Sequence, residues 1–170
     1  MSQTTLPEPW LRGTLSDVHP VTRAVLHALE LAKEDLQRWC GSLTDEELNT
    51  RPAGIAPVAF HLRHIARSID RLLTYAEGSQ LAAEQMAALK SELDPGATRA
   101  ALFNELESEL ARAAVRIRAI DPSRFSEVRK VGRKELQTTV GSLIVHVADH
   151  TQRHVGQAIT TSKIMKARAT

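Results

Sequence analysis

The chain is short of cysteine and of net charge, and each shortage excludes a class of protein. It has one cysteine, Cys40, so neither an intramolecular disulfide nor a metal cluster held by several thiolates can form within it. The 22 Lys and Arg residues nearly balance the 20 Asp and Glu residues, which leaves a formal net charge of +2 at pH 7. A protein that binds nucleic acid through the phosphate backbone needs a concentrated basic surface. This balance gives no indication of one, so we expect no nucleic-acid partner.

Long apolar runs and a leader segment are also missing. No stretch approaches the roughly 18 apolar residues that a membrane-spanning helix needs, and the N-terminus does not have the form of a signal peptide. We therefore expect a cytoplasmic protein without a membrane partner. Residues 1–16 contain two prolines and a glycine and are expected to form an extended N-terminal arm. A single domain is expected over residues 17–170.

Four long segments repeat apolar residues at three- and four-residue steps, which is the pattern of amphipathic helices. The first segment ends near Cys40, the second runs from Pro57 to about Gly78, the third ends at Asp121, and the fourth covers about 139–166. Short helices are expected after Thr44 and within residues 80–93, and a small hairpin is expected near residues 128–133. Four amphipathic helices of this length predict an all-α protein, a four-helix bundle.

Three of the seven histidines lie at four-residue intervals in the last of these segments: His146, His150 and His154. Residues four apart share one face of a helix and lie about 6 Å apart along its axis, so two such imidazoles can bind one ion. His146 and His154 are about 12 Å apart, too far for bonds of about 2 Å to a common ion. With Val147 at 0° on a helical wheel, His154 lies at about −20°, His150 at about −60° and His146 at about −100°. His150 and His154 are therefore predicted to face the core.

A second pair of histidines, His61 and His64, lies in the second helical segment. With Ile65 at 0°, His61 lies at about −40° and His64 at about −100°. Periodicity therefore slightly favours His61 as the inward residue. His64 lies beside the apolar face, from where its side chain could reach a neighbouring helix. The wheel leaves this choice open.

Two inward histidines on one helix and a further pair on another favour a metal site over hydrogen-bonded core histidines. Three neutral imidazoles suit zinc, nickel, iron or copper, and leave a position open for water or substrate. No histidine has a glutamate three residues before it, which excludes a ferritin-like di-iron site, and the His-Glu-x-x-His signature is absent. His19 and His27 are expected to be solvated. No carboxylate is expected beside the site, because Asp149 lies at about −160° on the wheel.

The motifs together resemble a known family. Phe60-His-Leu-Arg-His64-Ile-Ala and the later His150-x-x-x-His154-Val-Gly156-Gln157 are similar to those of the DinB family (DinB/YfiT-like metal-dependent proteins), and the resemblance extends over about residues 21–166. It implies a four-helix bundle with a crossover connection and short extra helices, in which three histidines hold a divalent metal ion. The ligands that it implies here are His64, His150 and His154. Gly156 would then allow close helix packing, and Gln157 could reach a metal-bound water.

The resemblance also implies a range of activities. Relatives in the wider superfamily include mycothiol-dependent maleylpyruvate isomerase, S-transferases that use low-molecular-weight thiols such as bacillithiol, and proteins described as hydrolases. We expect a divalent-metal-dependent enzyme, a thiol-dependent S-transferase or detoxifying enzyme, with zinc or nickel and a low-molecular-weight thiol acting on a small-molecule substrate. A metal-dependent hydrolase and a non-catalytic metal- or small-ligand-binding stress protein are the alternatives. A homodimer is compatible with spare apolar helix surface.

Overall fold

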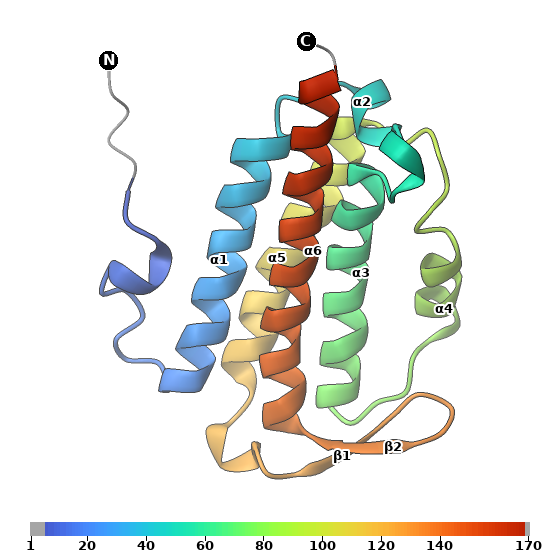
Figure 1. Ribbon diagram of the computed structural model, residues 1–170. Coiled ribbons are helices and arrows are strands. Elements are labelled where there is room, and N and C mark those ends of the chain that lie inside the picture. The colour runs from blue at the N-terminus through green and yellow to red at the C-terminus, as the bar shows by residue number, and fades with distance from the viewer. Residues whose placement is uncertain (1–5, 169–170) are drawn as a thin grey trace.

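The computed structural model describes residues 6–168, in which four long helices alternate with shorter elements (Figure 1). In chain order, the elements are η1 (Pro9–Leu11), α1 (Pro20–Cys40), α2 (Asp45–Asn49), η2 (Pro52–Gly54), α3 (Val58–Ala76), α4 (Ala83–Lys90), α5 (Arg99–Ala119), η3 (Pro122–Arg124), β1 (Val128–Val131), β2 (Leu136–Thr139) and α6 (Val140–Arg168). Every predicted helix is present, and so is the hairpin. The all-α prediction is confirmed.

The long helices α1, α3, α5 and α6 form a bundle. α6 packs against α1 and α3, and α5 packs against the same two helices. In Figure 1, α1 and α6 run upward whereas α3 and α5 run downward, so α3 and α6 are antiparallel. Because α3 and α5 run in the same direction, the chain must cross back between them, and it does so through α4 along the outer side of α3. The predicted bundle with a crossover connection and short extra helices is therefore confirmed.

The starts of several helices are set by local side-chain chemistry. Thr44 and Glu47 form a capping box at α2: Thr44 Oγ1 accepts the amide hydrogen of Glu47, and Glu47 Oε2 accepts that of Thr44. Thr98 caps α5 by accepting the amide hydrogen of Ala101. Pro20 occupies the first position of α1, where the helix needs no amide donor. These caps determine where the connections end and the helices begin.

The core lies along the bundle axis, where the apolar faces of the four helices meet. Fully buried side chains from all four include Leu36, Leu62, Ile65, Ile69, Leu106, Ile117 and Ile144. Burying one such side chain contributes about 1.5–3 kcal/mol. No helix among the described residues is both long and apolar enough to cross a membrane. The apolar layer holds α3 and α6 in a fixed register, and the positions of the polar side chains between them depend on it.

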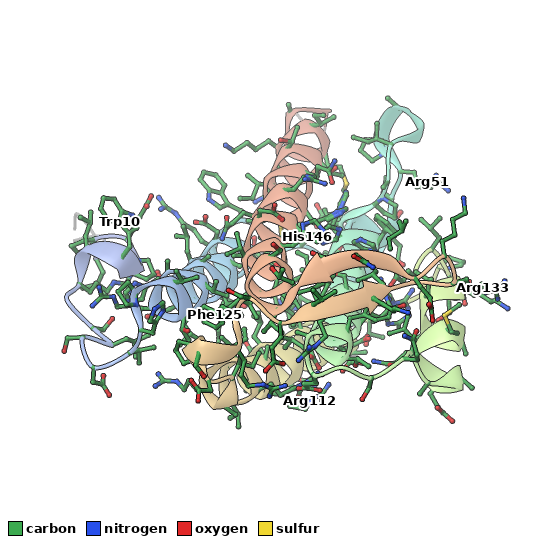
Figure 2. All side chains as sticks on the ribbon, turned by 90° about the horizontal axis from the view of Figure 1, so that it is seen from below. Trp10, Arg51, Arg112, Phe125, Arg133 and His146 are labelled. Atoms are coloured by element: carbon green, nitrogen blue, oxygen red, sulfur yellow. The ribbon has the colours of Figure 1, made fainter. Side chains whose placement is uncertain are left out.

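The hairpin of β1 and β2 lies across the lower end of the bundle, as Figure 2 shows from below. Its turn places Gly132 and Glu135 at positive φ angles of 69° and 48°. Arg129 Nε donates a hydrogen bond of 2.8 Å to the carbonyl oxygen of Ala76, the last residue of α3. Because β2 leads directly into α6, this contact links the start of α6 to the end of α3.

The described part of the predicted N-terminal arm lies beside α1, and its residues 1–5 lie outside the described residues (Figure 1). Arg12 donates hydrogen bonds of 2.6 and 2.7 Å to the carboxylate of Glu34 in α1. Thr14 Oγ1 lies 3.0 Å from His27 Nε2, and His27 is only 6% exposed. The expectation that His27 is solvated is therefore wrong, because the arm covers that side of α1.

Candidate metal centre

Four histidines meet where α3 crosses α6. Because the two helices are antiparallel, His64 lies opposite His150 and His61 lies opposite His154. The Nε2 atoms of His64 and His150 are 3.4 Å apart, and the Nδ1 atoms of His61 and His154 are 3.1 Å apart. His64, His150 and His154 each offer a ring nitrogen within 4.8 Å of the other two, a group that can hold a metal ion. The structure thus brings together the three histidines that the sequence analysis named as ligands.

A carboxylate from the crossover connection holds the ring of His64. Glu92, just after α4, is 4% exposed, and its Oε2 lies 2.6 Å from His64 Nδ1. Its Oε1 accepts a hydrogen bond of 2.8 Å from Nη1 of Arg71. Burial by itself would raise the pKa of Glu92, but its hydrogen bonds with His64 and Arg71, and their charges, outweigh burial and lower the pKa. The expectation that no carboxylate lies beside the site is therefore wrong: Asp149 is exposed, but Glu92 reaches the site from another segment.

The rings of His150 and His154 are also held on one nitrogen. Ser68 Oγ donates a hydrogen bond of 3.1 Å to the carbonyl oxygen of Ile65 and lies 3.4 Å from His150 Nδ1. Since the hydroxyl hydrogen of Ser68 is already used, its oxygen accepts from His150. His154 Nδ1 faces His61 Nδ1, which leaves Nε2 of His154 for the cluster. His61, buried as its place on the wheel indicated, thus lies behind His154 and outside the group of three.

These contacts determine which nitrogen each ring presents to its neighbours. When Nδ1 of His64 donates to Glu92 and Nδ1 of His150 donates to Ser68, the Nε2 atoms carry lone pairs. Two lone pairs at 3.4 Å repel each other unless a proton or a metal cation lies between them. Two nitrogens bound to one tetrahedral ion at about 2.0–2.1 Å are separated by about 3.3–3.4 Å. The donor set and its spacing therefore fit two ligands of one tetrahedral ion.

The surroundings keep most of these imidazoles neutral. Burial, reinforced by the charges of neighbouring histidines, lowers the pKa of His61, His150 and His154 to about 4. A metal ion binds only the unprotonated ring, so a proton is a weak competitor for these nitrogens near neutral pH. The pKa shifts and the arrangement of the lone pairs favour a cation at the same place.

An aromatic ring and a fifth histidine border the cluster. Phe60 stacks on His64, with ring centroids 5.2 Å apart and an angle of 22° between the planes, and it meets His61 and His154 edge-on. His146 contacts the ring of His150, but its Nδ1 is paired with the carboxylate of Asp149 at 2.7 Å. Among the described residues, His146 is not in the group that can share an ion, in agreement with its place at the edge of the wheel.

The residues that follow His154 do not pack against another helix. Gly156 is exposed, and no atom lies within 4 Å of the position that a Cβ would take. The implication that Gly156 allows close helix packing is therefore wrong. Gln157 is also exposed, and its proposed contact with a metal-bound water stays a prediction.

Sequence reasoning missed three residues that hold the ligand rings. Ser68 and Arg71 follow His64 by four and seven residues, so all three lie on one side of α3. That spacing is a signal that could have identified them. Glu92 carries no comparable signal, because it lies in the turn after α4, where no periodicity indicates which side chains face the bundle.

Comparisons with known proteins agree with this geometry. Among solved structures, the chain is similar to the crystal structure of a conserved protein from Enterococcus faecalis, with 20% sequence identity and a TM-score of 0.73 over 88% of this chain and 99% of that chain. That likeness concerns the fold. No curated protein matches the chain significantly. The family model of the DinB superfamily matches residues 28–158, which include all three candidate ligands. The chain therefore belongs to the DinB superfamily.

Proposed function

We propose that the protein is a divalent-metal-dependent enzyme in which His64, His150 and His154 hold the ion, zinc or nickel. The observation that supports this most directly is the set of three ring nitrogens within 4.8 Å, with no fourth protein ligand in the group formed by residues 6–168. Structural zinc sites use four protein ligands, whereas catalytic sites use three and leave a position for water or substrate. A three-histidine site therefore supports catalysis over a purely structural role.

The reaction that we propose is the transfer of a low-molecular-weight thiol to a small electrophilic substrate. A bound divalent ion supplies the charge that lowers the pKa of a coordinated thiol. The chain holds the rings that bind the ion: Glu92 orients His64, Ser68 orients His150, and His61 orients His154. Phe60 covers His64 and limits the access of water on that side.

Thiol transfer has more support than hydrolysis that depends on a carboxylate base. Both oxygens of Glu92 are engaged, one with His64 and one with Arg71, and its pKa is lowered despite burial. A general base needs a free oxygen within reach of the proton that it removes. A thiol bound as thiolate brings its own nucleophile and needs no such base.

The proposal is tested by metal content and by turnover. We expect about one zinc or nickel ion per chain after gentle purification, and metal-dependent consumption of a small thiol together with an electrophile such as 1-chloro-2,4-dinitrobenzene. The His150→Ala variant should lose both the ion and the activity. The matched control is His146→Ala, which removes a neighbouring histidine outside the group and should keep both.

Two results would contradict parts of this proposal. Wild-type protein that stays metal-free after incubation with zinc and nickel would exclude the metal site. Stoichiometric metal without consumption of any of a panel of thiols would instead indicate a non-catalytic metal-binding protein. Elemental analysis of His64→Ala beside His61→Ala separates the two histidines of α3, because only His64→Ala removes a proposed ligand.

A further inference from the structure

A second polar site lies on another side of α3, between α3, α4 and α5. It is a cavity of about 280 Å³ lined by residues of these three helices, among them Ala66, Arg71, Glu84, Ala88, Glu109 and Arg112. We call it the α4 cavity, because α4 covers it from outside the bundle (Figure 1). The His64 cluster lies between α3 and α6 instead, so the two sites use different sides of the same helix.

Glu109 of α5 lines the α4 cavity with one oxygen that has no hydrogen-bond donor. The residue is 1% exposed, and its Oε2 accepts hydrogen bonds from Nε and Nη2 of Arg112. Its Oε1 is buried and makes no hydrogen bond among the described residues. The closest charge to Oε1 is Nη1 of Arg116 at 4.0 Å, and that nitrogen donates to Asp70 at 2.8 Å. A buried, incompletely paired carboxylate oxygen is unfavourable, and a ligand that donates to it would relieve the deficit.

Most other polar groups of the cavity already have partners. Arg67 donates to Glu105 and to the carbonyl oxygen of Ala88, and Arg71 donates to Glu92. The need that remains inside the cavity is therefore a donor for Glu109.

The charges of the lining point to a cationic donor. Four carboxylates and three guanidinium groups line the cavity, so its formal charge is negative. Burial raises the pKa of Glu109, and Arg112 only partly offsets this, which indicates that its negative charge is not fully compensated. Glu84 of α4 adds a second carboxylate, which is exposed and has no ion pair among the described residues. Ala66 and Ala88 provide an apolar lining for a short alkyl chain.

We propose that the α4 cavity binds a short aliphatic amine, whose ammonium group donates to Oε1 of Glu109 while its alkyl chain contacts the alanines. A diamine fits best, because Glu84 offers a carboxylate for a second ammonium group. This site does not depend on the metal centre, and its ligand binds whether or not the histidines hold an ion.

Calorimetric titration of the full chain with 1,4-diaminobutane tests the proposal. We expect saturable binding that is weakened about 10-fold or more in Glu109→Gln, because this variant keeps the shape of the side chain and removes the charge from its hydrogen bond. Glu107→Gln is the matched control: Glu107 lies on the same helix, is exposed and does not line the α4 cavity, so binding should equal that of the wild type. Succinate, a dianion of similar length, should not bind at this site.

Each of three outcomes would overturn the proposal: no binding of 1,4-diaminobutane at millimolar concentration, tighter binding of succinate, or unchanged binding by Glu109→Gln. If Glu109→Gln fails to fold, amide chemical shifts of the wild-type protein decide instead. Binding at the α4 cavity shifts the signals of α4 and of the part of α5 around Glu109. Shifts confined to the surroundings of His150, or to any other surface, contradict it.

Discussion

The two polar sites beside α3 differ in how their charges are balanced. Between α3 and α6, neutral rings face one another, and a partner holds each ligand ring on one nitrogen. Between α3, α4 and α5, arginines and carboxylates pair with one another, and one buried oxygen of Glu109 is left over. Both sites invite a positive charge, but the first offers nitrogen lone pairs at the spacing of metal ligands and the second offers a carboxylate oxygen. The chemistry of the donor atoms, rather than net charge, therefore separates a metal site from an amine site on one helix.

Removing a ligand ring should have the largest effect on this comparison. Binding free energies of structural zinc are about 10–16 kcal/mol over four ligands, so His154→Ala should weaken zinc binding on the order of 100- to 1000-fold. Competition with a chromogenic chelator measures the affinity. Glu109→Gln should leave it unchanged, and a loss of metal affinity in Glu109→Gln as large as that in His154→Ala would show that the two sites are not independent.

Releasing the ring of His64 should have a smaller effect. Loss of a carboxylate that orients a ligand histidine typically weakens metal binding 10- to 100-fold, and we expect this range for Glu92→Gln in the same chelator assay. The control is Glu105→Gln, which removes the carboxylate partner of another α3 arginine, Arg67, on the cavity side. Equal losses in the two variants would mean that general damage to α3, rather than release of His64, explains the effect.

Acid should destabilise the metal-free protein through the histidine cluster. His61, His150 and His154 have a pKa of about 4 in the folded chain against an ordinary value of 6.5. Between these values the unfolded chain binds protons that the folded chain does not, so the free energy of unfolding falls as pH decreases from about 6.5 to 4. Urea unfolding at pH 7 and pH 5 measures the difference. Glu92, whose pKa is lowered, begins to contribute only below its ordinary value of 4.5.

The cavity should show the opposite slope. The pKa of Glu109 is raised by burial, so its folded form holds a proton at a pH where the unfolded form has lost it. Its contribution to stability therefore decreases as pH rises above 4.5. Replacing it with Gln removes this opposing contribution, and the gain in stability from pH 5 to pH 7 should be larger in Glu109→Gln than in the wild type. An equal or smaller gain would contradict the sign of this shift.

The smallest expected effect lies outside both sites. Gly156 is in the middle of α6 with open space around its Cα, so Gly156→Ala should stabilise the protein by about 0.4–1 kcal/mol through reduced freedom of the unfolded chain. Chemical denaturation measures this change, and metal affinity should stay within experimental error. A destabilising effect would indicate a packing contact at Gly156 that the bundle does not contain.

Much of the fold could be predicted because the helices carry their own periodicity. The apolar repeats predicted all four long helices, and the cap at Thr44 predicted α2. The inward direction of His150 and His154 followed from the same repeats. The choice between His61 and His64 could not be made from a wheel, because both rings face α6, and which of them meets His150 depends on the register of the two helices.

The misses have a common physical cause. Glu92 and His27 were misjudged because irregular segments determine their surroundings: the turn after α4 carries Glu92 inward, and the N-terminal arm covers His27. Gly156 was misjudged for the opposite reason, since a small residue suggested a contact on a side of α6 that faces solvent. Tertiary packing of non-periodic segments is not encoded in local spacing.

The antiparallel crossing of α3 and α6 also has a consequence for the order of folding. His64 and His150 are 86 positions apart in the chain, and α6 is the last described element to be synthesised. A nascent chain that ends before α6 contains one of the three proposed ligands and cannot chelate an ion. Contacts between distant segments form late because closing a long loop is entropically unfavourable. Capture of the metal therefore marks the completed bundle, and the bound ion then acts as a cross-link between the two halves of the chain.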